Sequence, residues 1–332
     1  MSIFGDRGTY GLVGAPRLKP FRRLAAGETA RFAYLDLVRD AGRSIFVAGD
    51  GRSGTTWLAD ILNFDNQYRY MFEPFHPTMS PVAKGLEFFQ YLPPDDECEF
   101  FRESAVRVLT GRYRDYRVDH LNRRHLATKR VIKDIFANLM LAWLKRQFPQ
   151  LPIVMIVRHP CAVAVSKMAQ RDSTWGVKPS TFLRQTAVMA DHLEPFRALI
   201  DRTDDEFEMH ILNWCIVHYI PLRQFRRGEL HVIAYEHLCD SREYTIRRMF
   251  DFLGLPFRQE AVAASQRPSA TITEDSAVVR RGELLASWQR KVGTAQRARA
   301  LEIMQAFGLD LYSDDPMPVI DDFNSRLAVP SG

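Results

Sequence analysis

The chain has 332 residues, of which 46% are hydrophobic and 26% charged, a composition that excludes disorder throughout and is typical of globular domains. Lys and Arg number 45 against 40 Asp and Glu, a mildly basic balance that suits an anionic ligand better than a nucleic-acid partner. No apolar run approaches the ~20 residues of a membrane-spanning helix, and the N-terminus lacks the apolar core of a secretory signal.

The cysteines indicate the redox compartment of the protein, and the lack of a long linker indicates the number of its domains. None of the four has a partner at CxxC spacing: Cys98, Cys161, Cys215 and Cys239. We therefore expect reduced thiols in a soluble, cytoplasmic protein, with no metal site. We predict one domain, with a lead-in over residues 1–40 packed on a core of residues 41–332. Nothing in the sequence sets an oligomeric state.

Short apolar runs alternate with segments of helical character along the chain. Buried strands are predicted at Ser44–Gly49, Arg130–Lys133, Ile153–Val157 and Leu230–Ala234. Their apolar residues are continuous, which is typical of strands covered on both faces in a parallel sheet. Helices are predicted at residues 55–63, 138–148, 162–171, 182–199, 207–226 and 241–253. This alternation predicts an α/β fold with a central parallel sheet flanked by helices.

A glycine-rich loop follows the first predicted strand. Counted from Gly49, the sequence has the spacing G-x-x-x-x-G-T-T of a phosphate-binding loop, between a buried strand and a helix. Such glycines let backbone N–H groups converge on a phosphate, and the helix N-terminus adds its positive dipole end. Arg52 is the cation of this loop, and Ser53, Thr55 and Thr56 add hydroxyl donors. Thr55 stands where a nucleoside triphosphatase has lysine, which argues against nucleoside triphosphate chemistry.

A second anion site is predicted where the strand Ile153–Val157 ends. Arg158 follows that strand directly, and Ser166 lies on the helix after it. Ligands of open α/β sheets bind at the carboxyl ends of strands, and an arginine with a hydroxyl can hold a phosphate. Two anion sites at two strand ends imply a ligand with phosphates on the 5′ and 3′ sides of a ribose.

Segments of the chain resemble, in order, motifs of the sulfotransferase family, which uses 3′-phosphoadenosine 5′-phosphosulfate (PAPS). Residues 51–58, GRSGTTWL, are similar to its 5′-phosphosulfate loop, and residues 157–168, VRHPCAVAVSKM, to its 3′-phosphate motif. Residues 232–255 resemble its "YEDL…FLGL" stretch. Arg52 in the loop is similar to the carbohydrate and tyrosylprotein branches, and residues 70–77, YMFEPFHP, resemble the "YEP" segment of carbohydrate sulfotransferases.

The resemblance implies a P-loop-like phosphosulfate site, with PAPS as co-substrate and PAP as product. It implies that the phosphosulfate is held by Arg52, Ser53, Gly54, Thr55 and Thr56. Trp57 either supports the nucleotide or packs within its helix. Arg158 and Ser166 are expected to hold the 3′-phosphate. Before Trp288, three residues resemble the family's RKG segment and are expected to contact the nucleotide: Arg280, Arg281 and Gly282.

Three residues are expected to act on the reacting groups. Family members with an arginine in the loop often use a glutamate base after the first helix, and Glu73 matches that position, with His76 as its rival. The position of the histidine base in the small-molecule branch holds Ile135, which favours Glu73. Lys133 keeps the family's lysine position and, with Arg52, is expected to stabilise the transferring group and the departing PAP.

The acceptor is expected to carry a hydroxyl, and the segment 70–77 favours a carbohydrate or glycoconjugate. Between Arg102 and Lys133, ten Lys and Arg stand against three acidic residues. That segment predicts either an entrance for an acidic or sugar-containing acceptor or a solvated charged surface. Two other functions stay open on the residues alone: a P-loop kinase-like phosphotransferase, and a non-catalytic nucleotide-binding module.

Overall fold

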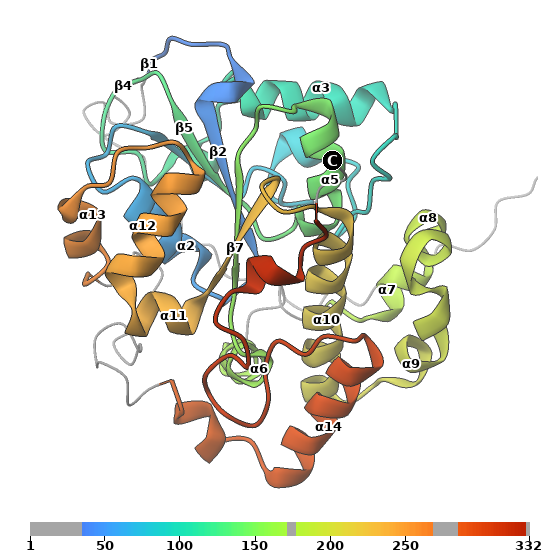
Figure 1. Ribbon diagram of the computed structural model, residues 1–332. Helices are drawn as coiled ribbons and strands as arrows, with labels where there is room; N and C mark the ends of the chain where they lie inside the picture. Colours follow the sequence, from blue (N-terminus) through green and yellow to red (C-terminus); the bar gives the residue numbers. More distant parts are fainter. Residues whose placement is uncertain (1–34, 171–176, 268–284, 330–332) are drawn as a thin grey trace, which may run out of the picture.

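A computed structural model describes residues 35–170, 177–267 and 285–329. Its centre is a sheet of five parallel strands in the order β3-β5-β2-β6-β7 (Figure 1). These strands are β2 (Ser44–Gly49), β3 (Arg69–Phe72), β5 (Arg130–Lys133), β6 (Ile153–Val157) and β7 (Leu230–Ala234). A separate two-stranded ladder joins β1 (Leu35–Asp36) to β4 (Leu126–Ala127). The predicted parallel sheet and the bounds of its four predicted strands are confirmed.

Helices cover both faces of the sheet, giving three layers (Figure 1). One face is covered by α2 (Thr55–Leu62), α11 (Tyr235–Asp240), α12 (Arg242–Phe252) and α13 (Gln259–Ala264). The other is covered by α3 (Glu99–Leu109), α5 (Leu141–Gln147), α6 (Pro160–Met168), α10 (Glu206–Gln224) and α14 (Thr294–Ala306). Short helices complete the set: α4 (Tyr116–Asp119), α7 (Ser180–Leu183), α8 (Thr186–Val188) and α9 (Arg197–Arg202).

The two helical layers explain why the strands are apolar at consecutive positions. In β2, Phe46 and Ala48 belong to the core on the α6–α10 side, while Ile45 and Val47 belong to the core on the α2–α12 side. Successive side chains of a strand point to opposite faces, so a strand buried on both faces needs apolar residues throughout. In the described part of the chain, none of the helices combines the length and apolar character needed to cross a bilayer.

One predicted helix is broken. Instead of a single helix over residues 182–199, the chain forms α7, α8, a π-helical turn at Met189–Leu193, a 3₁₀ turn at Glu194–Phe196 and then α9. At the first break the side chain of Gln185 bonds to another segment, accepting from the amide of Tyr91 at 2.8 Å and donating to the carbonyl of Phe89 at 3.2 Å. At the last break, Pro195 has no amide hydrogen that could form a helical hydrogen bond. Apolar periodicity continues through both breaks, so it conceals them.

Candidate active site

The predicted site residues gather at the carboxyl ends of four neighbouring strands. Phe72 pairs with Lys133, Lys133 with Val47, and Gly49 with Ile156, so β3, β5, β2 and β6 end at one edge of the sheet. Glu73 directly follows β3, the glycine-rich loop follows β2 and Arg158 follows β6. Lys133 is the last residue of β5. Parallel strands lie about 4.8 Å apart, so neighbouring ends place side chains within reach of one ligand.

The backbone of the loop of residues 50–54 depends on two glycines, one directly before the loop and one at its end. Gly49 has a φ of 147° and Gly54 one of 93°, and a Cβ at Gly54 would lie 2.8 Å from the ring of Tyr235. Arg52 also has a left-handed backbone, with a φ of 70°. Asn138 fixes the start of the loop, because its amide accepts from the Gly49 N–H and donates to the Gly49 carbonyl, both at 3.1 Å. The loop therefore has a defined, strained shape before any ligand binds.

The loop is tied to α6, and these ties join the two predicted phosphate motifs. Arg52 Nε donates to Ser166 Oγ at 3.0 Å. One residue further on, Lys167 Nζ contacts both carboxylate oxygens of Asp50 at 2.7 Å, in a pair that is almost completely buried. Sequence reasoning missed the Asp50–Lys167 pair, because no local pattern links residues 117 positions apart.

Two guanidinium groups meet at this loop. Arg158 NH1 donates to the carbonyl of Arg52 at 3.1 Å, and its guanidinium lies over the ring of Tyr235, 4.4 Å from the centroid. Burial, with the nearby charge of Arg158, lowers the pKa of Arg52. Within residues 35–170, 177–267 and 285–329, no carboxylate forms an ion pair with either arginine. Two arginines at one loop, neither in an ion pair with a carboxylate of the described residues, can attract an anionic group.

A buried hydroxyl in the same loop is also left without a partner. Ser53 Oγ is buried and makes no hydrogen bond among the described residues. Gly54 caps α2 without a side chain, so the first-turn amides of that helix receive no side-chain acceptor. A buried polar atom without a partner costs free energy, and a phosphate or sulfate oxygen would supply the missing acceptor. The loop thus fits the 5′-phosphosulfate that the sequence predicts.

Glu73 lies on the turn after β3 and is held by two cations. Lys133 Nζ contacts one carboxylate oxygen, and Arg117 NH2 donates to the other at 3.3 Å. Arg117 NH1 also donates to the backbone carbonyls of Glu73 at 3.0 Å and Phe72 at 3.3 Å. The backbone of Glu73 is left-handed, with a φ of 48°, and its amide donates to the Lys133 carbonyl at 2.6 Å. Two of the sequence candidates, Glu73 and Lys133, are therefore in contact, and Arg117 joins them.

The rival base and the neighbouring aspartate occupy apolar surroundings. His76 is 2% exposed, and its ring contacts those of Phe136 and Phe88, with centroids 4.4 and 5.8 Å away. Asp134 accepts from the backbone amides of Phe75, Phe136 and Ala137 at 2.7–3.1 Å. Burial raises the pKa of Asp134 to about 6. Both groups are buried, Glu73 at 8% exposure, but the Glu73 carboxylate lies between two cations, whereas the His76 ring lies between aromatic rings, so Glu73 is the better candidate for proton transfer.

The remaining residues expected to contact the nucleotide either pack within the fold or lie outside the described residues. Trp57 is 1% exposed; its indole N–H donates to the carbonyl of Ser265 at 3.2 Å and its ring packs against Tyr235. Of the two roles considered for Trp57, these contacts correspond to packing rather than to support of the nucleotide. Thr55 and Thr56 start α2 in buried positions. Arg280, Arg281 and Gly282 lie outside the described residues. Trp288, which follows them, stacks on His159 next to Arg158, with centroids 4.1 Å apart.

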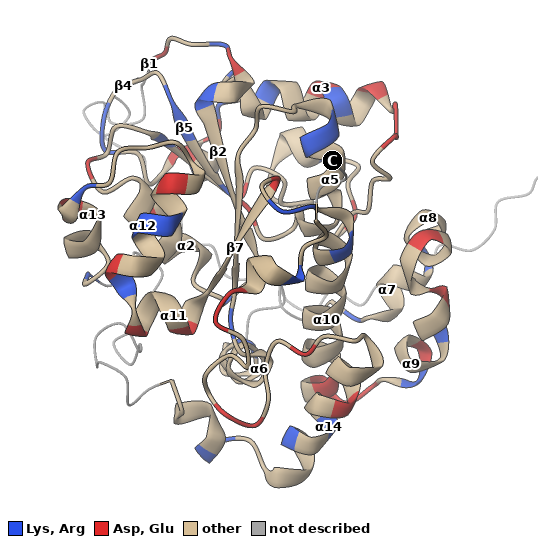
Figure 2. Ribbon diagram, viewed as in Figure 1, with Lys and Arg blue, Asp and Glu red and all other residues tan. Residues whose placement is uncertain are grey.

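The cations of the basic segment serve different purposes. Arg130 is fully buried and pairs with Asp36 at 2.8 Å, so it holds the β1–β4 ladder against the sheet. Lys133 and Arg117 contact Glu73. Figure 2 shows further basic positions on α3 and beside β4 and β5, with acidic positions among them on α3. The exposed arginines of the segment are Arg102, Arg107, Arg112, Arg114, Arg123 and Arg124. The segment is thus partly structural and partly placed beside the predicted base.

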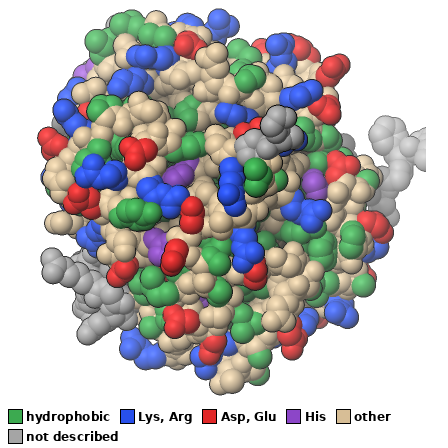
Figure 3. Space-filling model, in the orientation of Figure 1, with side chains coloured by type: hydrophobic (Ala, Val, Ile, Leu, Met, Phe, Trp, Pro, Cys, Tyr) green, Lys and Arg blue, Asp and Glu red, His purple; other side chains and the backbone are tan. Residues whose placement is uncertain are grey.

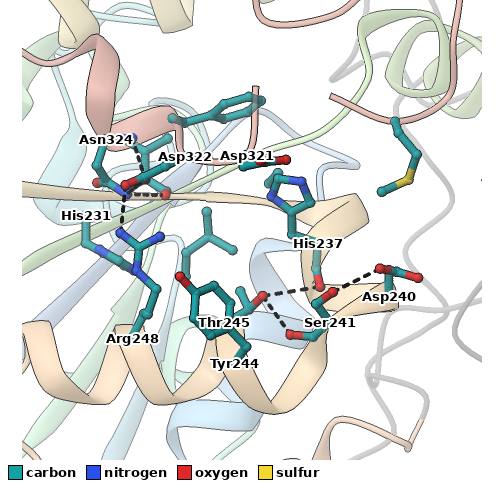
Figure 4. A pocket seen from close by; sticks show the side chains of 15 residues that line it. His231, His237, Asp240, Ser241, Tyr244, Thr245, Arg248, Asp321, Asp322 and Asn324 are labelled. Atoms are coloured by element: carbon teal, nitrogen blue, oxygen red, sulfur yellow. Dashed lines mark hydrogen bonds and ion pairs between the residues drawn. The ribbon is translucent and has the colours of Figure 1, made fainter. Parts of the chain in front are cut away.

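A cavity of about 390 Å³ lies at the free edge of β7, the opposite edge of the sheet from β3 (Figure 4). The Asn324 amide pairs with the N–H and carbonyl of Val232 at 2.8 and 3.0 Å, as a neighbouring strand would. Arg248 forms an ion pair with Asp322 at 2.7 Å, and burial lowers the pKa of His231 to about 4. On this face charged side chains of both signs are mixed with hydrophobic ones (Figure 3). None of the site residues above lines this cavity.

Comparison with known proteins gives one matching family model and a set of similar solved structures. No curated protein matches the sequence. Among solved structures, a sulfotransferase domain from the curacin biosynthetic pathway is 16% identical, with 84% of this chain and 100% of that chain covered and a TM-score of 0.42. A mouse sulfotransferase complexed with PAP is 15% identical, covering 84% and 91%, with a TM-score of 0.43. Retinol dehydratase in complex with androsterone and PAP is 16% identical, covering 84% of each chain, with a TM-score of 0.41.

A family model decides the assignment. The model described as the sulfotransferase family matches residues 44–259. This range is more than half of the chain and contains the loop, Glu73, Lys133, Arg158 and Ser166. The chain therefore belongs to the sulfotransferase family.

Proposed function

We propose that this protein transfers the sulfuryl group of PAPS to a hydroxyl of a carbohydrate or glycoconjugate acceptor, with Glu73 as general base. The observation that carries the proposal is the meeting of Arg52 and Arg158 beside the unpartnered Ser53 hydroxyl, with no carboxylate paired to either arginine among the described residues. Family membership supports sulfuryl transfer, and the similarity of residues 70–77 to carbohydrate sulfotransferases supports the acceptor class.

The residues divide between holding the nucleotide and acting on the reacting groups. The loop amides, Ser53 and Arg52 hold the phosphosulfate, and Arg158 with Ser166 holds the 3′-phosphate. The bond between Arg52 and Ser166 makes these two sites one rigid unit. PAPS supplies the sulfuryl group, and PAP leaves with the oxygen that had bridged to sulfur.

Glu73 and Lys133 act at opposite ends of the transfer. Glu73 takes the proton of the acceptor hydroxyl as that oxygen bonds to sulfur. Lys133 donates to the bridging oxygen, whose negative charge grows as its bond to sulfur breaks. Their contact before substrates bind keeps the two side chains beside each other. The burial of Glu73, which is 8% exposed, limits the competition of water for these interactions.

Labelled donors distinguish this function from its two rivals. The protein is incubated with sulfur-labelled PAPS or γ-labelled ATP and a panel of neutral sugars, acidic sugars, simple alcohols and a tyrosine peptide. We expect label to move from PAPS to a sugar, with one PAP released per sulfate transferred. Transfer from ATP alone would favour a kinase-like enzyme. Tight PAP binding without transfer to any acceptor would favour a nucleotide-binding module.

Replacing Arg158 with alanine is expected to weaken PAP binding far more than binding of adenosine 5′-phosphosulfate, which lacks the 3′-phosphate. Losing a charge-assisted contact should reduce the binding free energy of PAP by about 1.5–3 kcal/mol, which raises its Kd roughly 10- to 150-fold. Calorimetric titration of both nucleotides measures the difference. Equal weakening of the two would place Arg158 elsewhere, because its contribution would then not depend on the 3′-phosphate.

A further inference from the structure

We infer that Arg117 is the positioning residue of the catalytic glutamate: it holds both the turn on which Glu73 lies and one oxygen of its carboxylate. This inference rests on the proposed function, because it assigns a role through Glu73. Arg117 comes from α4, which contributes no strand end to the site. No sequence motif selects it from the neighbouring arginines.

The first observation is the strained backbone of Glu73. Among the described residues, the non-glycine positions with left-handed backbone are Arg52, Asn66, Glu73 and Phe89. For a non-glycine residue this conformation is about 1 kcal/mol or more higher in free energy than extended or helical backbone, so surrounding contacts must stabilise it. At Glu73 the amide donates to the Lys133 carbonyl, and the carbonyl accepts from Arg117 at 3.0 Å and from the amide of His76 at 3.2 Å. Arg117 also bonds to the carbonyl of Phe72, so its guanidinium spans the turn.

The second observation is the division of the carboxylate between two cations. Lys133 contacts one oxygen and Arg117 the other. If Lys133 turns to the oxygen of the departing PAP, it leaves Glu73 during the reaction. Arg117 is anchored by two backbone carbonyls and can keep its contact with Glu73 throughout. The charge that holds the base is thus separate from the charge that serves the leaving group.

The other charged and titratable groups around Glu73 do not replace this contact. Asp134, on the segment after β5, is close enough for its charge to be affected by Glu73, and its oxygens accept from backbone amides. Tyr70, on β3, is completely buried. His76 lies between aromatic rings. Apart from Lys133, Arg117 is the cation that the described structure pairs with Glu73.

Two variants separate the charge of Arg117 from its hydrogen bonds. Arg117→Gln keeps an amide donor but removes the positive charge. We expect kcat to fall about three- to tenfold with the Kd of PAP unchanged, since Glu73 then loses the contact that keeps its carboxylate in place. Arg117→Lys keeps the charge but not the planar fork that spans both backbone carbonyls, so it should recover only part of the lost kcat.

The control and the double variant make the test decisive. Arg197→Gln removes an arginine that also pairs with a glutamate, the exposed Glu194 on another part of the surface, and should leave kcat unchanged. In a Glu73→Gln background, measured by its residual transfer, Arg117→Gln should have no further effect. An unchanged kcat in Arg117→Gln, or additive losses in the double variant, would overturn the inference. Neither result would affect the donor assignment, which fails only if PAPS supplies no sulfate.

Discussion

Replacing Glu73 with glutamine is expected to reduce sulfuryl transfer by about 10²- to 10⁴-fold, the usual contribution of a positioned general base. Glutamine has nearly the same shape, and its single carbonyl oxygen can accept from either Lys133 or Arg117, but it cannot take the proton of an acceptor hydroxyl. PAP binding should be unchanged, because no described contact joins Glu73 to the loop of residues 50–54 or to Arg158. Initial rates of sulfate transfer and PAP titration calorimetry measure the two effects separately.

Two matched variants control this result. His76→Gln should retain most of the activity, because its ring packs between Phe88 and Phe136 rather than beside Lys133. Lys133→Met should lower kcat with little change in PAP affinity, since its charge serves the transition state. A Glu73→Gln variant with nearly normal kcat would remove the base assignment. A selective loss in His76→Gln would then transfer that role to the histidine.

Breaking the buried pair between Asp50 and Lys167 is expected to have the largest effect on stability. Either Asp50→Asn or Lys167→Met breaks this ion pair while the other charge stays buried, and breaking a buried pair typically costs about 3–5 kcal/mol of the free energy of unfolding. The pair also joins the loop of residues 50–54 to α6, so a variant that folds should bind PAP more weakly. Urea unfolding measures the first effect, and calorimetry below the unfolding transition measures the second.

The double variant Asp50→Asn/Lys167→Met tests whether the buried charge is the cause. Removing both charges should recover about half or more of the stability lost by either single variant, because no unpaired ion then remains. The exposed pair of Arg247 and Glu243 on α12 is the matched control, and its disruption should change stability by less than about 1 kcal/mol. Additive losses in the double variant would mean that the two side chains stabilise the fold independently.

The parallel sheet could be predicted because its signal is local. Each of the four predicted strands is an apolar run that the structure confirms residue for residue, and the loop after β2 has a spacing that only a phosphate-binding turn commonly uses. The order of the strands is not encoded locally, although it places Glu73 and Lys133 on neighbouring strand ends. The interrupted helix at residues 182–199 shows the limit of periodicity, since the contacts of Gln185 come from residues 89 and 91.

By itself, the sequence determined the α/β class, the glycine-rich loop with its arginine, and the residues Glu73, Lys133, Arg158 and Ser166 as candidates. These depend on residue type and short spacing, which are visible along a chain. Only the tertiary structure decided which side chains meet: Arg52 with Ser166, Asp50 with Lys167, and Arg117 with Glu73. Such contacts join residues 44 to 117 positions apart, so they arise only after the sheet has ordered its strands. Charge and hydrogen bonding act over a few ångströms of space rather than along the chain.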